Sequence, residues 1–207
     1  MNARTRIALI ALVFSLLMGA LTPAALAGDQ FNLLVNNNNF DTPGEDLGSG
    51  YLPPWTVTNK SSDRSDCNET LAAFSGKCAF RFKGSATEAS RLVQIVKNSD
   101  LDTLNAFVDD ANVSIQMAYY INSLSTFTNL KAKTVVTLAG SDEKIKSVAN
   151  FSGSTMIGEF TNWQSVDGTV AIVPQDSVVT KVKVVFANKS SKGKALIDDV
   201  AVLFASM

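Results

Sequence analysis

Short runs in which apolar and polar residues alternate, separated by turn residues, extend from about residue 31 to residue 204. Alternation with a period of two places successive side chains on opposite faces of a strand, so each run predicts a β-strand. Ten or so strands with no internal repeat and no linker predict an all-β fold, a single antiparallel β-sandwich. The expected strands are Phe31–Val35, Trp55–Thr58, Cys78–Phe82, Ser90–Val96, Asn112–Ile121, Lys133–Ala139, Gly158–Gln164, Thr169–Val173, Thr180–Ala187 and Ala195–Phe204.

One stretch has the spacing of a helix. Leu101, Leu104 and Val108 recur at intervals of three and four residues, and Ser99 precedes them. This pattern predicts a short connecting helix over residues 99–108, with Ser99 as its N-cap.

The first 27 residues have the features of a targeting signal. Arg4 and Arg6 precede an apolar run from Ile7 to Leu21, and small residues follow as far as Ala27. This order predicts a signal peptide over residues 1–27, cleaved after Ala27. The apolar run of about 15 residues is shorter than the roughly 20 that a membrane-spanning helix needs. Residues 28–207 are therefore expected to form one secreted domain with no transmembrane segment.

The composition of the chain argues against several classes of function. The chain contains no His, which removes the commonest general base and most zinc or copper sites. The formal net charge is -1 and no basic stripe is visible along the sequence, so nucleic acid and anionic membranes are not expected partners. Neighbouring acids such as Asp198 and Asp199 would point to opposite faces of a strand and form no acid–base pair. We therefore expect that the protein is not an enzyme.

Cys67 and Cys78 are the only cysteines. In an exported chain an even number of cysteines indicates a disulfide, here one that closes a short loop. Such a bond stabilises a fold by roughly 2–3 kcal/mol in the chain-entropy model. A redox pair would have the tighter Cys-x-x-Cys spacing, which is absent.

The last strand-like run contains an acid in an apolar setting. Simple alternation places Asp198 on the same face as Leu196 and Val200. A lone buried carboxylate costs several kcal/mol unless it is hydrogen-bonded, paired or bound to a metal, so one of these partners is expected.

Six short segments follow one another along the chain. They are the Asn-rich turn that ends in Phe40-Asp41, Pro54-Trp55, Gly76 to Phe82, Leu92 to Val96, Trp163 to Val166 followed by Thr169 and Pro174, and Ile197 to Val200. Their order resembles that of galactose-binding-like jelly-roll domains, in particular bacterial extracellular carbohydrate-binding modules. The resemblance covers roughly residues 32–203.

This resemblance implies a structural calcium ion where the first segment crosses the last strand. The implied ligands are the carboxylates of Asp41 and Asp198, with backbone carbonyls near Asn39 and Lys77. Calcium takes six to eight oxygen ligands, which suits such a mixture. The family more often has Glu where this chain has Asp41, so this shorter side chain would bind less directly. Backbone N–H groups or a salt bridge remain alternative partners for Asp198.

The resemblance also implies non-catalytic binding of a polysaccharide or other glycan, in a groove on a sheet face or at loops. Trp55 and Trp163 fall at framework positions of the resemblance. The candidate binding residues are Tyr120 and Gln116 on one strand face, Arg81, Gln94, and Tyr51 in the long loop after Asp41. The alternative from another class is a structural or adhesive extracellular protein that uses the sandwich to contact other proteins. A glycoside hydrolase is the least favoured alternative.

Overall fold

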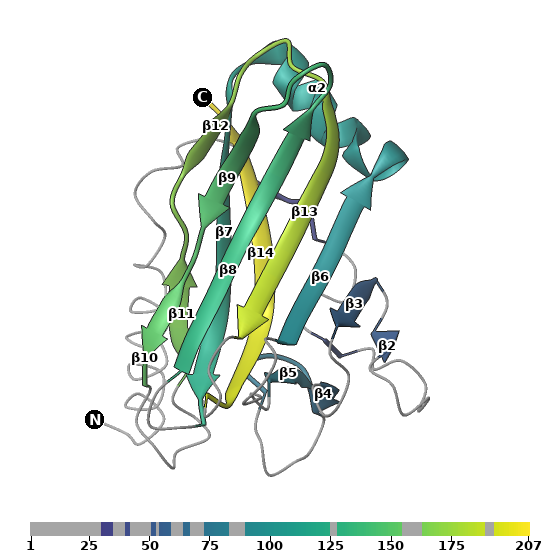
Figure 1. Cartoon of the computed structure of the whole chain (residues 1–207). Coiled ribbons are helices and arrows are strands. Elements are labelled where there is room, and N and C mark those ends of the chain that lie inside the picture. Colours follow the sequence, from purple (N-terminus) through teal and green to yellow (C-terminus); the bar gives the residue numbers. More distant parts are fainter. Residues whose placement is uncertain are drawn as a thin grey trace, which may run out of the picture.

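The computed structural model describes residues 30–34, 40–41, 51–52, 54–58, 64–66, 73–82, 90–124, 128–154, 163–188 and 193–207. Within these residues, two antiparallel sheets of seven strands each pack face to face (Figure 1). The predicted all-β antiparallel sandwich is therefore confirmed.

Sheet A has the strand order β11-β7-β14-β5-β4, with β1 paired to β14 and β12 paired to β7. Its strands are β1 (Gln30–Asn32), β4 (Arg64–Asp66), β5 (Ala79–Phe82), β7 (Val113–Ser123), β11 (Gln164–Asp167), β12 (Ala171–Val173) and β14 (Ala195–Ser206).

Sheet B has the order β10-β8-β13-β6-β3-β2, with β9 paired to β8. Its strands are β2 (Tyr51–Leu52), β3 (Trp55–Thr58), β6 (Ser90–Lys97), β8 (Thr128–Leu138), β9 (Lys144–Val148), β10 (Phe151–Gly153) and β13 (Val179–Asn188). Strands that follow each other in the sequence often lie in different sheets, as in the crossing from β6 to β7.

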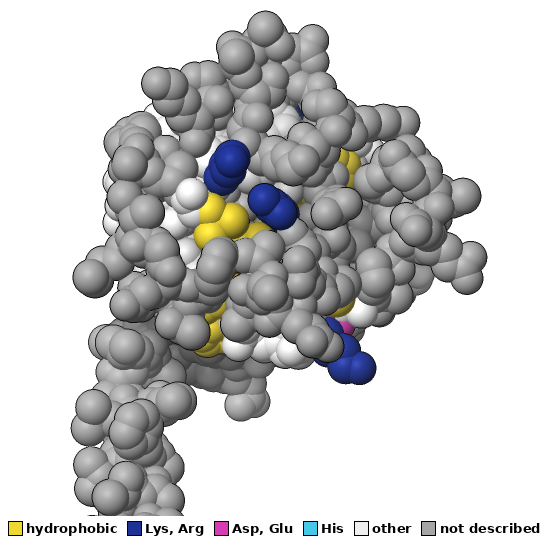
Figure 2. Space-filling model, turned by 90° about the horizontal axis from the view of Figure 1, so that it is seen from below, with side chains coloured by type: hydrophobic (Ala, Val, Ile, Leu, Met, Phe, Trp, Pro, Cys, Tyr) yellow, Lys and Arg dark blue, Asp and Glu magenta, His cyan; other side chains and the backbone are white. Residues whose placement is uncertain are grey.

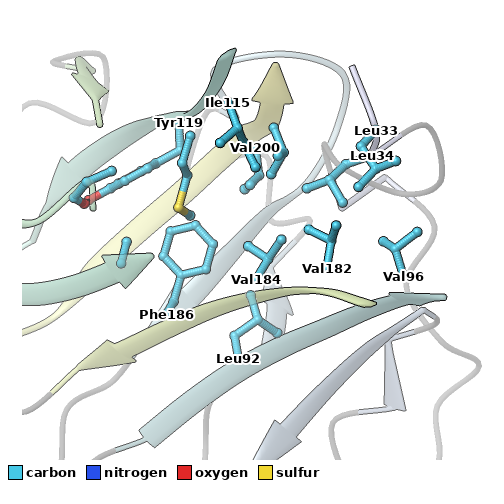
Figure 3. Packing of buried hydrophobic residues seen from close by; sticks show 14 of the residues in the cluster. Leu33, Leu34, Leu92, Val96, Ile115, Tyr119, Val182, Val184, Phe186 and Val200 are labelled. Atoms are coloured by element: carbon cyan, nitrogen blue, oxygen red, sulfur yellow. The ribbon is translucent and has the colours of Figure 1, made fainter. Parts of the chain in front are cut away.

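The core between the sheets follows the predicted alternation. The β7 residues Val113, Ile115, Met117 and Tyr119 are buried, as are the β13 residues Val182, Val184 and Phe186, and both sets belong to one apolar cluster (Figure 3). The Tyr119 hydroxyl donates a hydrogen bond of 2.9 Å to the carbonyl of Ala149, which satisfies its polar end inside the core.

Trp55 is a core residue, as predicted. Only 2% of its surface is exposed, and its ring centroid lies 5.6 Å from that of Phe40 and 6.3 Å from that of Phe186. Phe40 in turn packs against Phe80, so these rings connect the segment before Asp41 to both sheets.

The predicted helix is present, but it begins differently. A 3-10 turn η2 (Asn98–Leu101) leads into α2 (Asp102–Asp110), and Leu101, Leu104 and Val108 are buried. The prediction of Ser99 as N-cap is wrong, because Leu101 precedes α2 and no side chain caps it. Ser99 lies within the 3-10 turn, where its backbone carbonyl accepts a hydrogen bond from the Asp102 amide.

Four strands were not predicted: β2, β4, β9 and β10. Of these, β9 and β10 pair with β8 in sheet B. Of the expected strand over residues 158–164, only Trp163 and Gln164 are described, and β11 begins at Gln164.

Several predictions concern residues outside the described part of the chain. The signal peptide and Cys67 lie there, so the cleavage site and the disulfide remain predictions, although Cys78 is buried with 2% of its surface exposed. Among the described residues, no helix is long and apolar enough to cross a membrane.

Candidate functional site

A β-bulge in β14 changes the face on which Asp198 lies. The pairing of β14 with β7 shifts between Asp198 and Ala201, and Asp199 has a left-handed backbone with a φ of 45°. As a result Ile197 and Val200 both join the core, whereas Leu196 packs in a separate small cluster with Ala79. Asp198 is on the side of Leu196, the outer face of sheet A, so the predicted common face with Val200 is wrong. One extra residue in a strand reverses the alternation beyond it.

The turn formed by residues 73–78 covers Asp198. The Ser75 amide donates to Asp198 Oδ2 over 3.0 Å, and the Asp199 amide donates to Asp198 Oδ1 over 2.8 Å. The Ser75 hydroxyl also donates to Asp199 Oδ1 over 2.8 Å. The side chain of Asp198 has no exposed surface, and this burial raises the pKa of its carboxyl to about 7, with a smaller contribution from the neighbouring charge of Asp199. Backbone hydrogen bonds from Ser75, Asp199 and Phe74 act in the opposite direction.

Asp41 holds the other half of the same turn. Its Oδ1 accepts hydrogen bonds from the amides of Lys77 over 2.6 Å and Cys78 over 2.8 Å. Gly76 makes this approach possible, because it has a φ of +61° and a Cβ on it would overlap the Asp41 carboxylate. Asp41 and Asp198, which are far apart in the sequence, therefore both bind the 73–78 turn.

The arrangement fits the predicted calcium site in the kind of donor. Asp41 and Asp198 offer carboxylate oxygens beside one turn, and a carboxylate oxygen can accept more than one bond. No group of three or more His, Cys, Asp or Glu residues that could hold a metal occurs within the described ranges, so carbonyls or water would supply the remaining ligands. The alternative of backbone N–H partners for Asp198 is present in the structure. No cation is among the described groups that shift its pKa, so a salt bridge receives no support.

Three aromatic rings gather above this part of sheet A, and we call them the aromatic cluster: Phe74, Tyr120 and Trp163. The ring of Phe74 stacks on that of Tyr120, with centroids 3.5 Å apart and planes inclined by 14°. Trp163 meets Phe74 edge to face at 6.1 Å. Phe74 is 41% exposed, which is unusual for so large an apolar side chain.

The surroundings of the aromatic cluster are both apolar and polar. Leu196 lies beneath it, packed with Trp163 and Ala73. Ser165 is opposite Tyr120 in the register of β11 and is exposed. Phe74 and Ser165 together offer an apolar ring and a hydroxyl group on this face. Seen from below, the described part of the surface shows small hydrophobic areas with Lys or Arg side chains beside them (Figure 2).

Three of the five predicted binding residues share the outer face of sheet A. Tyr120 is half-buried beneath Phe74, and Arg81 is half-buried on β5, opposite Leu196. Gln116 is on the same face, but it is only 5% exposed and its Nε2 donates to the Gly168 carbonyl over 3.0 Å. Tyr120 and Arg81 can therefore serve a common surface, whereas Gln116 is occupied in holding the chain around Gly168.

The other two predicted binding residues belong to sheet B. Gln94 is 5% exposed and is on the core-facing side of β6 with Leu92 and Val96, so its assignment to a groove or to solvent is wrong. Alternation along β6 places Val93 and Ile95 outside and Gln94 inside. Tyr51 is in strand β2, paired with Thr56 at the edge of sheet B, and not in a loop as expected.

Phe74 was missed in the sequence, although it is the most exposed ring of the cluster. A signal was present: Phe74 directly precedes the turn residues Ser75 and Gly76, where an apolar ring has no strand to bury it. Trp163 was expected to be a framework residue. It does pack against the small cluster of Leu196, but it also contacts Phe74.

Comparison with known proteins supports the fold. No protein-family model and no curated protein sequence matches the chain. Among solved structures, TmCBM61 in complex with β-1,4-galactotriose has 17% identity and a TM-score of 0.51, over 83% of this chain and 97% of that one. A family 16 carbohydrate-binding module has 11% identity and a TM-score of 0.51, over 82% and 98%. The Stig cyclase Fisc from Fischerella sp. TAU has 9% identity and a TM-score of 0.49, over 86% and 99%.

At these identities the similarity concerns the fold alone. The two antiparallel sheets form a β-sandwich with the galactose-binding-like jelly-roll fold of the carbohydrate-binding modules above. The fold predicted from the six sequence segments is thereby confirmed.

Proposed function

We propose that this chain, which has the β-sandwich fold of carbohydrate-binding modules, is a secreted, non-catalytic protein that binds a glycan at the aromatic cluster. The observation that carries the proposal is the exposed ring of Phe74, stacked on Tyr120 over the outer face of sheet A. The similar module TmCBM61 was solved with β-1,4-galactotriose, which supports a glycan as the class of ligand.

The chemistry of the aromatic cluster suits a sugar ring. One face of a pyranose presents C–H groups that pack on an aromatic ring, while its hydroxyls need hydrogen-bonding partners at the edge. Phe74 supplies the ring, and Tyr120 fixes the orientation of Phe74 by stacking beneath it. Arg81 and Ser165 supply polar groups on the same face.

The acids of the chain support a role without catalysis. Among the described residues, the carboxyl with the most perturbed pKa is that of Asp198, which is fully buried under the 73–78 turn and cannot reach a substrate. The chain has no His to act as a base or to activate a serine.

A glycan array followed by calorimetric titration of the strongest glycan tests the proposal. Phe74→Ala is expected to weaken binding about tenfold, because a stacked aromatic contact is worth about 0.5–1.5 kcal/mol in addition to the free energy of the apolar area that it buries. Ile172→Ala is the matched control, since Ile172 is also 41% exposed and belongs to the same sheet. The affinity of the Ile172→Ala variant for the glycan is expected to stay within about twofold of that of the unaltered protein.

Two results would count against the glycan site. Equal loss of affinity in both variants would place binding elsewhere. Failure of the unaltered protein to bind any glycan on the array would favour the adhesive alternative, in which the exposed rings contact another extracellular protein.

We also propose that calcium binds at the carboxylates of Asp41 and Asp198 beside the 73–78 turn, through oxygen lone pairs that the amides of the turn do not occupy. The buried Asp198 carboxyl supports this, since its two amide bonds do not offset the effect of burial on its pKa. A calcium ion would supply the positive charge that ionised Asp198 otherwise lacks.

Removal of calcium by EDTA is then expected to lower the melting temperature by about 5 °C. A ligand at a hundred times its Kd stabilises the folded state by about 2.7 kcal/mol, and each kcal/mol corresponds to at least about 2 °C in a domain of this size. Asp198→Ala should abolish the difference between EDTA and calcium. Calorimetry in both buffers measures this, and identical melting curves for the unaltered protein would exclude the calcium site.

The remaining proposals concern export. We infer that residues 1–27 are removed after Ala27 and that Cys67 and Cys78 form a disulfide in the oxidising environment outside the cell. The even number of cysteines and the burial of Cys78 support the bond. Mass spectrometry of the exported protein, before and after reduction, tests both.

A further inference from the structure

The strand register of sheet B brings distant lysines together on its outer face. Three strands each contribute a Lys-x-Lys pair: Lys131 and Lys133 on β8, Lys144 and Lys146 on β9, and Lys181 and Lys183 on β13. The two lysines of each pair point to the same side of their strand, since one residue separates them. The residues between them, such as Ala132 and Val182, are buried in the core, so the lysines are on the outer face.

Strand β6 extends this surface. Lys97 is directly opposite Lys181 in the register, and Arg91 is opposite Ala187. The eight cations form one surface, which we call the basic face, and seven of them are exposed while Lys183 is half-buried. Strands β9, β8, β13 and β6 run side by side at the front of Figure 1. Neighbouring strands are about 4.8 Å apart and alternate residues about 6.8 Å, so the cations lie within a single patch.

The described strands that form the basic face carry cations at their outward positions without acids between them, and the acids nearest to them in the sequence are Asp142 and Glu143 in the turn before Lys144. No Asp or Glu occupies an outward position of sheet B among the strand residues that the structure describes; the positions between the cations are held by Val93, Ile95, Val135, Thr137 and Val185. The whole chain has 18 Lys and Arg and 19 Asp and Glu. The basic face therefore leaves ten cations against 19 acids in the rest of the chain, a strong separation of charge in a nearly neutral protein.

Such a surface has an energetic cost. Like charges directly opposite each other on neighbouring strands, as Lys97 and Lys181 are, destabilise a sheet. An anionic polymer lying along the face would remove this repulsion, and each of its charges would find several ammonium groups within reach.

We propose that the basic face is a second binding surface, which takes a linear polysaccharide carrying carboxylate or sulfate groups. Charge complementarity supports an anionic polymer, and two further features favour a polysaccharide. The outward positions described on β6, β8, β9 and β13 hold no aromatic ring on which a nucleic acid base could stack. Ile95, 49% exposed, is the one large apolar side chain among them, too little to insert into a membrane interface.

The basic face and the aromatic cluster are independent surfaces. The aromatic cluster covers the outer face of sheet A and the basic face is the outer face of sheet B, with the core between them. The inference therefore goes beyond the proposed glycan site, and either one can fail while the other holds.

Titration of the full chain with polygalacturonate and with dextran sulfate tests the basic face. Both polyanions are expected to bind, and neutral dextran is expected to bind at least tenfold more weakly. The affinity for the polyanions should fall about tenfold between low salt and about 0.3 M salt, because salt screens exposed charges. Tight binding to only one polymer would identify the anionic group that the face prefers.

The double variant Lys181→Gln/Lys183→Gln removes two charges from the centre of the face and is expected to weaken binding about tenfold. Lys194→Glu is the matched control, because it also lowers the net charge by two and Lys194 directly precedes β14 of sheet A. The affinity of this control for the polyanions should change by less than about twofold. Circular dichroism checks that both variants fold, and the affinity of each for the array glycan reports on the aromatic cluster separately.

Three results would overturn this inference. The first is no binding of either polyanion at low salt, which would mean that the lysines only solvate the sheet. The second is an equal loss of affinity in Lys181→Gln/Lys183→Gln and in Lys194→Glu. The third is binding of duplex DNA or of phosphatidylserine vesicles as tightly as the polysaccharides, which would make the surface a general anion binder.

Discussion

In calcium-free buffer, the free energy of unfolding is expected to fall by about 3 kcal/mol as the pH rises from about 5 to about 8. The cause is Asp198, whose carboxyl is buried under the 73–78 turn and has its pKa raised to about 7. Ionising it inside the fold requires placing a charge where water is excluded. The unfolded chain ionises the same group freely.

The fall in stability with rising pH follows from the number of protons that the folded and the unfolded states bind. The unfolded Asp198 loses its proton near pH 3.9, whereas the folded one keeps it until about pH 7. Between these values the folded state binds one proton more, so each rise in pH favours unfolding. The stabilising contribution is complete below about pH 4 and lost as the pH passes 7. The chain has no His, so no other side chain with an ordinary pKa titrates between pH 5 and 8.

Asp198→Asn is the matched control, since it keeps the shape of the side chain and removes the ionisation. Its amide leaves one of the two backbone donors poorly paired, so its absolute stability will differ, but the dependence on pH should flatten. Urea unfolding at several pH values in EDTA measures both proteins. An equal slope in the two would show that Asp198 is not the titrating group.

The strands could be predicted from sequence where alternation is unbroken. In β7 and β13 every second residue is apolar and buried, and the predicted faces are the observed ones. The prediction failed at Asp199, where a single left-handed residue inserts a bulge and reverses the faces of β14. Asp tolerates this conformation better than most residues, but two adjacent acids do not by themselves indicate a bulge.

The candidate surfaces depend on pairing that the sequence does not contain. Tyr120 and Arg81 were correctly placed on one surface because each alternates away from a core strand face. The stacking of Phe74 on Tyr120 requires the 73–78 turn to fold back over sheet A. The basic face was missed for a similar reason: the Lys-x-Lys pairs are visible, but only the register between β9, β8, β13 and β6 makes them neighbours.

The 73–78 turn is thus the element on which both the buried acid and the exposed ring depend, and Gly76 is its most sensitive position. Gly76→Ala is expected to lower the free energy of unfolding by about 3 kcal/mol. About 1 kcal/mol of this comes from placing a Cβ on a residue with a φ of +61°. The rest arises because the Cβ would displace the Asp41 carboxylate, which accepts bonds from Lys77 and Cys78.

A double-mutant cycle separates these two contributions. In an Asp41→Ala background the carboxylate is already gone, so adding Gly76→Ala should cost only about 1 kcal/mol, giving a coupling of about 2 kcal/mol. Urea unfolding of the four proteins in EDTA measures the coupling without any contribution from calcium. If the two substitutions are additive, Asp41 does not hold the turn. If the two substitutions couple, displacement of the Asp41 carboxylate should also loosen Phe74 above Tyr120. Gly76→Ala should then weaken glycan binding at the aromatic cluster, while the affinity of the basic face for polyanions stays unchanged.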